Sequence, residues 1–393
     1  MLRTRMPHAK IPRRYQPSRR VGWCGVLLVA SFWLVVALSR PGYGEVTLIT
    51  DVQPSRAHGL AALAWIAEGD LSREDRQQAE QRLAGHLAWM EANLPADWGR
   101  WSLARRGEWV FQQMHAQLLT GEYQENQHAL SHALLKGDYN CVSATMLFRI
   151  LCDNTGLPTV PLQTRGHVWC RLLGSPELDI ETTCPTWFLL EPHVRTQAPA
   201  VQAAEGARAL TDRGLAAKIP YNKASLAAAD GDYAAAIDLL NQALRLDPQD
   251  PAALKNRSVI WNNWAVQCVS QHECEQALGL LREIETAAPH DPVLAENRQR
   301  IVDDVLDEWC RLGRFSDALR LKQWQEQAEK LAGSSQSSRH SVRSIYEQWI
   351  AQATKQGKWF EAKNALRAAL AELERDPLAA AQLRRQFREL SPS

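Results

Sequence analysis

A repeating pattern of apolar positions begins at Cys141. Apolar residues recur every three or four positions along one side of this stretch: Val142, Met146, Leu147, Ile150 and Leu151. This spacing predicts a helix of about three turns. Asn140 is a suitable N-cap residue, and Gly156 followed by Pro158 is typical of a helix end. The pattern therefore places Cys141 in the first turn.

After this helix the period of the pattern changes from helical spacing to strict alternation. Residues 158–173 alternate as two paired strands would, with residues 164–166 as the turn between them. In such a strand one face carries His167, Trp169 and Arg171, and the other carries Val168, Cys170 and Leu172. A third short strand is predicted over residues 177–183. There Asp179, Glu181 and Thr183 project to one side.

The N-terminal segment has a different pattern. Residues 21–38 form a run of 18 positions without a charge, which is long enough to span most of a bilayer core. Four of the arginines that precede the run lie close to it (Arg13, Arg14, Arg19 and Arg20), whereas Arg40 alone follows closely. The run is therefore predicted to be a transmembrane signal anchor in the inner membrane of a cell, with residues 1–20 as a basic cytoplasmic tail. The main domains are then outside the cytoplasm, in the periplasm. A cleaved signal peptide and a secreted protein are the alternative.

Residues 45–195 are predicted to form one domain with a helical lead-in. Helical periodicity is found over residues 57–67, 73–90 and 109–119. His115 on the last of these helices is expected to be a core or solvated residue.

A change of composition follows this domain. Residues 196–211 are rich in Ala, Gln and Pro, so residues 196–214 are predicted to be a linker. Beyond them a six-residue pattern ending in Ala starts four times, 41, 41 and 44 residues apart, at Gly231, His272, Gly313 and Gly357. Each repeat is predicted to be a helical hairpin with its turn at the first residue of the pattern and the Ala where the helices cross.

These hairpins resemble tetratricopeptide repeats, although the usual repeat is shorter, at about 34 residues. The resemblance implies an all-α solenoid over residues 215–377, whose concave surface binds a peptide or protein partner. Six tryptophans of this half are expected in its core: Trp261, Trp264, Trp309, Trp324, Trp349 and Trp359. Cys268 and Cys274 flank one predicted turn and are expected to form a disulfide in an oxidising compartment.

The predicted positions of three side chains suit nucleophilic thiol chemistry. A cysteine reacts as thiolate, which a helix N-terminus and a neighbouring imidazole favour. Cys141 is predicted at a helix N-terminus, and His167 can supply the imidazole. A third group must orient the imidazole, and both Glu181 and Asp179 are candidates. The other cysteines of this region, Cys152, Cys170 and Cys184, are expected to be core residues or disulfide partners.

The same residues resemble the transglutaminase-like superfamily, which has a papain-like cysteine–histidine–aspartate site. The resemblance covers residues 100–195 and lies in three motifs, NCVSAT, GHVWCRL and LDIETTCP. It implies an α+β core with Cys141, His167 and Glu181 in the catalytic roles, and Glu replaces the usual Asp. Asp179 is the alternative acid. Tyr139 and Asn140 are candidates for oxyanion donors, and Trp169 is a candidate for the cleft.

Charge narrows the range of partners. The chain has 45 basic and 44 acidic residues, but eight of the basic ones lie in the first 44 residues. The remaining 37 basic and 44 acidic residues have a net charge of −7, which argues against nucleic-acid binding. The sequence has no phosphate-binding loop, EF-hand or paired CxxC motif, so no cofactor or metal is expected.

Two functions are consistent with these features. In the first, Cys141 attacks a peptide or carboxamide carbonyl, and the protein is a membrane-anchored hydrolase or transamidase with a repeat region for protein binding. In the second, the transglutaminase-like domain and the repeats form a non-catalytic scaffold. The presence of the cysteine favours the enzyme.

Overall fold

The structure is a computed structural model of the 393-residue chain. It describes residues 56–69, 71–195, 206–287, 292–332, 338–374 and 376–388. The predicted anchor and cytoplasmic tail lie outside these residues. Within the described ranges, no helix is both long and apolar enough to cross a membrane. The membrane location therefore stays a prediction.

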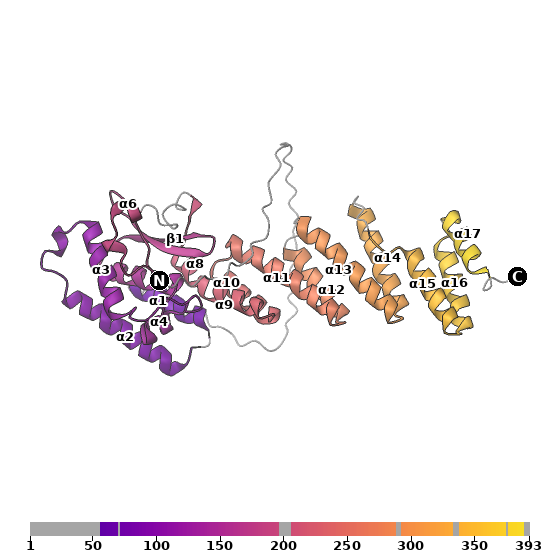
Figure 1. The fold of residues 1–393 in the computed structure, drawn as a ribbon, viewed down its shortest axis with the longest axis horizontal. Coiled ribbons are helices and arrows are strands. Elements are labelled where there is room, and N and C mark those ends of the chain that lie inside the picture. Colours follow the sequence, from indigo (N-terminus) through magenta and orange to yellow (C-terminus); the bar gives the residue numbers. More distant parts are fainter. Residues whose placement is uncertain are drawn as a thin grey trace, which may run out of the picture. The chain divides into compact units, whose positions relative to one another are not determined.

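The fold is mostly helical and contains one small antiparallel sheet, as Figure 1 shows. Five helical elements come first along the described chain: α1 (Arg56–Glu68), α2 (Arg73–Ala92), η1 (Trp98–Arg100), α3 (Leu103–Gln117) and α4 (Leu130–Lys136). The three predicted lead-in helices correspond to α1, α2 and α3. Ser72 and Ser102 begin α2 and α3 as N-caps, because each side-chain oxygen accepts a hydrogen bond from the backbone N–H three residues on.

The next helix, α5 (Cys141–Asn154), is the centre of a hydrophobic core, the first core, that is built mainly from α1 to α5 and the sheet. The predicted apolar stripe is confirmed, but burial is not limited to it. Every residue from Cys141 to Phe148 is buried, including Ser143 and Thr145. The reason is that α1, α3, α4 and the sheet all pack against α5. A one-sided pattern therefore underestimates how far this helix is enclosed.

The sheet has four strands in the order β3-β2-β1-β4. These are β1 (Thr159–Thr164), β2 (His167–Leu172), β3 (Leu178–Ile180) and β4 (Arg208–Ala209). The predicted hairpin is confirmed, since β1 and β2 pair in antiparallel register with Thr164 opposite His167. Gly166 in the turn has a φ of +86°, a conformation that glycine adopts without strain. The third strand is shorter than predicted.

The predicted linker is structured in its second half. Residues 196–205 lie outside the described ranges, but β4 pairs with β1, and α8 (Asp212–Ala216) follows it. Leu215 and Ala216 are fully buried in the same core as α5. Arg149 of α5 also donates a hydrogen bond of 3.0 Å to Asp212. The apolar residues within this Ala-rich segment pack on the first core, so residues 206–214 do not act as a free linker.

The rest of the described chain consists of helical hairpins and one final helix. The hairpins are α9 (Lys218–Ala229) with α10 (Tyr233–Leu246), α11 (Pro251–Ser270) with α12 (Cys274–Ala287), α13 (Pro292–Arg311) with α14 (Phe315–Ala332), and α15 (Val342–Lys355) with α16 (Trp359–Glu372), followed by α17 (Pro377–Gln386). Their order along the chain can be followed by colour in Figure 1.

The turns lie at the four predicted positions. Gly231, Gly313 and Gly357 have φ angles of +81°, +76° and +71°, and His272 takes the same conformation at +66°. The alanine five residues after each turn is fully buried: Ala236, Ala277, Ala318 and Ala362. A larger side chain there would separate the two helices. The hairpin prediction is thus confirmed.

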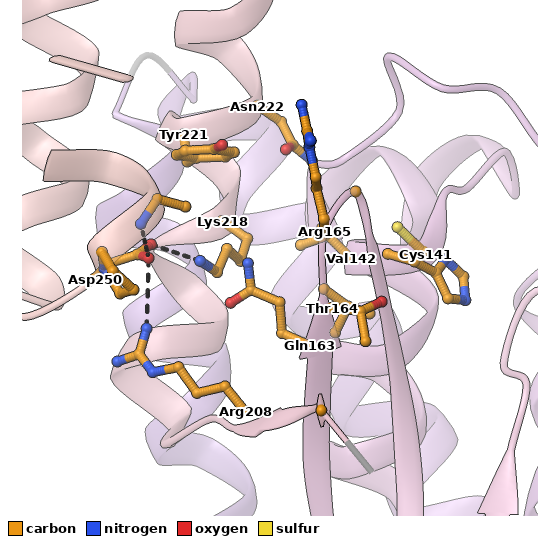
Figure 2. A pocket seen from close by; sticks show the side chains of 16 residues that line it. Cys141, Val142, Gln163, Thr164, Arg165, Arg208, Lys218, Tyr221, Asn222 and Asp250 are labelled. Atoms are coloured by element: carbon orange, nitrogen blue, oxygen red, sulfur yellow. Dashed lines mark hydrogen bonds and ion pairs between the residues drawn. The ribbon is translucent and has the colours of Figure 1, made fainter. Parts of the chain in front are cut away.

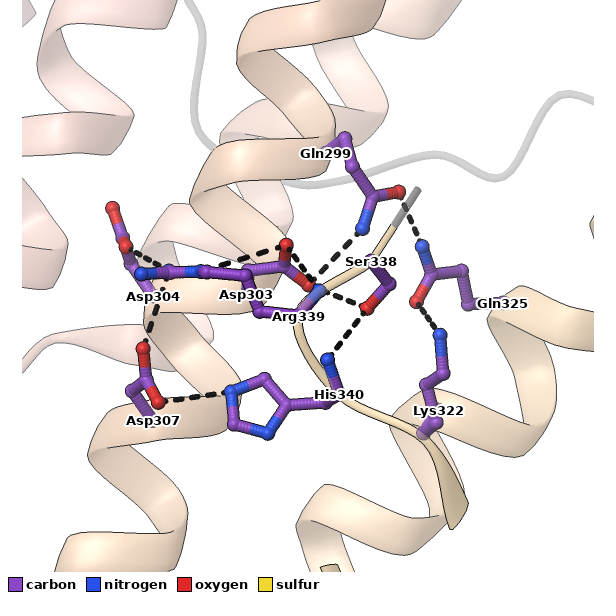
Figure 3. A network of polar contacts seen from close by, with 9 residues as sticks. All are labelled: Gln299, Asp303, Asp304, Asp307, Lys322, Gln325, Ser338, Arg339 and His340. Atoms are coloured by element: carbon purple, nitrogen blue, oxygen red, sulfur yellow. Dashed lines mark hydrogen bonds and ion pairs between the residues drawn. The ribbon is translucent and has the colours of Figure 1, made fainter. Parts of the chain in front are cut away.

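A polar network fixes residues 338–340, which come before α15 in the chain (Figure 3). The carboxylate of Asp303 on α13 is buried and accepts hydrogen bonds from Ser338 Oγ at 2.7 Å and from the backbone N–H of Arg339 at 3.1 Å. His340 Nε2 lies 2.9 Å from Asp307 Oδ1. Because these contacts attach residues 338–340 to α13, α15 starts from a defined position.

Two expectations for the repeat half are corrected. Trp261 and Trp309 are buried, but Trp324 and Trp359 are 54% and 50% exposed, so they lie on helix faces that the described residues leave largely open to solvent. The predicted disulfide between Cys268 and Cys274 is wrong. Both are free and buried in the hairpin core, where burial raises the pKa of each thiol, that of Cys268 to about 11.

Candidate active site

Cys141 is the first residue of α5, as predicted. Asn140 caps this helix, because its Oδ1 accepts hydrogen bonds from the N–H groups of Val142 at 2.8 Å and Ser143 at 3.2 Å. Ser143 Oγ in turn accepts from the N–H of Asn140 at 3.0 Å, which completes a capping box. The cap defines where the helix begins. The thiol is therefore held where the helix dipole favours negative charge.

His167 is the first residue of β2, and the Glu181 carboxylate and the Cys141 thiol both interact with its ring. Its Nε2 is 2.6 Å from Oε2 of Glu181, and the Cys141 thiol is near enough to the ring to contribute to the rise in its pKa. Because Nε2 is engaged by the carboxylate, Nδ1 is the nitrogen that remains for the sulfur. Burial lowers the pKa of His167, but the contacts with Cys141 and Glu181 outweigh burial and raise this pKa from 6.5 to about 10.

Glu181 is held in place by the residue two positions on. Its second oxygen, Oε1, accepts hydrogen bonds from the hydroxyl of Thr183 at 2.6 Å and from its N–H at 3.2 Å. Burial alone would raise the pKa of Glu181, but the contacts with His167 and Thr183 lower it. Glu181 is therefore a fixed anion that can orient the imidazole.

Asp179, the alternative acid, has other partners. Its two oxygens accept hydrogen bonds from Arg171 Nε at 2.7 Å and Nη2 at 2.9 Å, and Trp169 Nε1 donates to it at 3.3 Å. Arg171 is directly opposite Asp179 in the β2–β3 register. The two acids that were predicted on one strand face therefore have different partners: Glu181, just after β3, contacts the histidine, and Asp179 contacts the arginine.

The other three predicted site residues, Trp169, Asn140 and Tyr139, are buried next to the site and do not line its pocket, which is described below. Trp169 is fully buried, and its ring lies nearly parallel to that of His167, at an angle of 13° and a centroid distance of 6.1 Å. Asn140 Nδ2 donates to the carbonyl of Glu125 at 2.9 Å, so both ends of its amide are engaged. Tyr139 is buried against the rings of His115 and Tyr123.

A set of contacts that no sequence pattern indicated supports the turn that carries Glu181. His115 Nε2 lies 3.1 Å from the carbonyl oxygen of Thr182, and burial lowers the pKa of His115 to about 4. The hydroxyl of Thr182 bonds that of Thr145 on α5 at 2.8 Å. These contacts attach the turn that carries Glu181 to α3 and α5. His115 thus has a positional role that its helical pattern did not indicate.

A pocket of about 350 Å³ opens beside the thiol (Figure 2). Cys141 and His167 line one side of it, together with the turn between β1 and β2. The opposite wall comes from α9 and the start of α11, through residues such as Tyr221 and Pro251. The volume is at the lower end of the range for small-molecule sites, about 300–1,000 Å³. The pocket therefore joins the thiol to the first two hairpins.

A buried ion-pair network holds that wall together. Lys218 Nζ lies 2.5 Å from Asp250 Oδ2, and both side chains are only 2% exposed. Arg208 of β4 reaches Asp247 at 2.8 Å and Asp250 at 3.4 Å. Asp250 is also the N-cap of α11. The network ties the sheet edge to α9 and α11, and no motif in the sequence indicated it.

Comparisons with protein-family models, curated proteins and solved structures gave no match to this chain. The resemblance to the transglutaminase-like superfamily accordingly stays a prediction.

Proposed function

We propose that this chain is a thiol-dependent acyl-transfer enzyme that acts on peptide or carboxamide bonds. Cys141 is the nucleophile, His167 is the proton carrier, and Glu181 is the group that orients the imidazole. The observation that carries the proposal is the 2.6 Å contact between His167 and Glu181, together with the pocket that His167 and Cys141 line side by side with the turn between β1 and β2.

The reaction follows from these positions. The Cys141 thiolate attacks the carbonyl carbon of the substrate, and the C=O electron pair moves to the oxygen. The imidazolium of His167 gives its proton to the leaving amine, the C–N bond breaks, and a thioester to Cys141 remains. Water or a second amine then attacks the thioester and loses a proton to His167. The products are an acid or a new amide, and the thiol is restored.

The start of α5 offers one donor for the oxyanion. The side chain of Asn140 occupies the N–H groups of Val142 and Ser143. The N–H of Cys141 itself is therefore the donor that we assign to the developing negative charge. The candidates Asn140 and Tyr139 are a poorer choice, because their side chains have other partners or are buried.

The helical hairpins suit a second role in protein binding. Hairpins with small residues at the helix crossings stack into solenoids that bind peptides, and the resemblance to tetratricopeptide repeats supports this use. We further propose that residues 21–38 anchor the protein in the membrane, with the enzyme outside the cytoplasm. The substrate is then a peptide or protein in that compartment.

Alkylation of the folded protein tests the thiol chemistry. We expect iodoacetamide to modify Cys141 faster than the half-exposed Cys184 near neutral pH, with each site quantified by mass spectrometry. His167→Ala is expected to slow the alkylation of Cys141 by about tenfold or more, because it removes the imidazolium that favours the thiolate. If Cys141 in the folded protein reacts no faster than in urea, the enzyme proposal fails, and the non-catalytic scaffold is the better interpretation.

A further inference from the structure

The charges around the pocket do not cancel. Lys218 and Arg208 lie on its wall, but Asp250 and Asp247 pair with them. Arg165 also lines the pocket, and it makes no ion pair within the described part of the chain. The wall around the thiol therefore has one positive charge in excess.

The position of Arg165 is set by the hairpin. It lies in the turn between β1 and β2, two residues before His167, and Gly166 with its φ of +86° makes the turn tight. Arg165 lines the pocket together with Asn222 and Tyr221, as Figure 2 shows, and its positive charge offsets part of the rise in the pKa of Tyr221 that burial causes. The exposed Arg165 side chain thus lines the same pocket as Cys141.

We infer that the pocket binds an acyl donor that carries a carboxylate, namely an acidic peptide. The carboxylate pairs with Arg165 while the carbonyl to be attacked lies at Cys141. This inference rests on the proposed function and adds the substrate class to it. A guanidinium also suits phosphate. An acidic side chain is the better fit here, because it belongs to the same peptide as the amide bond that is attacked.

The first hairpin then takes part in substrate binding. Asn222 and Tyr221 lie across the pocket from the thiol, on α9. The amide of Asn222 has no hydrogen-bond partner within the described residues, so it is free to bond the peptide backbone. The substrate is therefore enclosed between the thiol-bearing core and the hairpins.

The test compares two chloroacetyl probes that differ in one charge. Chloroacetyl-glutamate amide and chloroacetyl-glutamine amide have nearly the same shape, and each alkylates Cys141 through its chloromethylene carbon. We expect the glutamate probe to react faster with the full chain. Arg165→Gln should remove about twofold to fivefold of that preference, the range for an exposed ion pair. Arg165→Lys should retain part of it.

Arg367→Gln is the matched control, because Arg367 is also exposed but lies on α16. It should leave the preference unchanged, whereas raising the salt concentration should reduce the preference of the unaltered chain. An unchanged preference in Arg165→Gln overturns the anion site while leaving the thiol chemistry intact. If Cys141 does not react rapidly even with iodoacetamide, the proposed function itself fails.

Discussion

His167 Nε2 lies 2.6 Å from Glu181 Oε2, and both side chains are largely shielded from solvent. Burial lowers the pKa of the imidazole, but Cys141 and the carboxylate of Glu181 together raise it to about 10, while the contacts with His167 and Thr183 lower the pKa of the carboxyl. The relationship couples the chemistry of the site to its stability.

The stability of the fold should depend on pH through this pair. The folded-state pKa of His167 is raised from 6.5 to about 10, so its contribution is complete below pH 6.5 and is lost as the pH rises towards 10. Glu181→Gln should therefore cost about 1–3 kcal/mol of unfolding free energy at pH 6. The cost should be smaller at pH 10, as measured by urea denaturation. An equal cost at both pH values would contradict the coupling.

The two acids should separate in their effects on the thiol. Glu181→Gln removes the partner of His167 and is expected to slow alkylation of Cys141 about tenfold or more. Asp179→Asn breaks the contact with Arg171 and should lower stability with little effect on alkylation. Iodoacetamide kinetics and thermal unfolding of both variants measure this. The opposite ranking would move the orienting role to Asp179.

The buried network on the pocket wall should be sensitive to single substitutions. Asp250→Asn leaves the charge of Lys218 without its closest partner, where burial already lowers the pKa of the ammonium group. The expected loss is about 3–5 kcal/mol in chemical denaturation. The double variant Lys218→Met with Asp250→Leu should recover a large part of it. If the single variant is as stable as the unaltered chain, the network does not hold the wall.

Truncation should locate the boundary of the first folding unit. A chain that ends at residue 214 lacks Leu215 and Ile219, which are fully buried in the core of α5. Each contributes about 1.5–3 kcal/mol, so this chain should unfold. A chain that ends at residue 287 keeps α9 to α12 and should preserve both its circular dichroism and rapid labelling of Cys141. A stable, reactive chain ending at 214 would place the boundary earlier.

The helix crossings should not accept larger side chains. Ala362 on α16 is fully buried, whereas Ala368 on the same helix is exposed. Ala362→Leu is expected to destabilise the repeat region by about 1–3 kcal/mol through overpacking, and Ala368→Leu should be close to neutral. Thermal unfolding of the two variants gives the comparison. Equal stability would mean that the crossing has room to adjust.

The sequence alone determined the features that depend on neighbours along the chain. Asn140 caps α5 through contacts within three residues, so the place of Cys141 in the first turn followed from the local pattern. The turns at Gly166 and Gly231 were predictable for the same reason, since a positive φ favours glycine. Each of these features has its cause within one element or one turn.

Tertiary structure decided the rest. The sequence pattern placed Asp179 and Glu181 on the same face of one predicted strand, so it could not choose between them. In the structure β3 ends at Ile180, its pairing with β2 puts Arg171 opposite Asp179, and Glu181 in the turn that follows contacts His167. The pocket joins Cys141 to Asp250, more than a hundred residues away. Contacts between such distant residues depend on how whole helices and strands pack against one another. Because these contacts do not recur at a regular spacing along the chain, no sequence pattern indicates them.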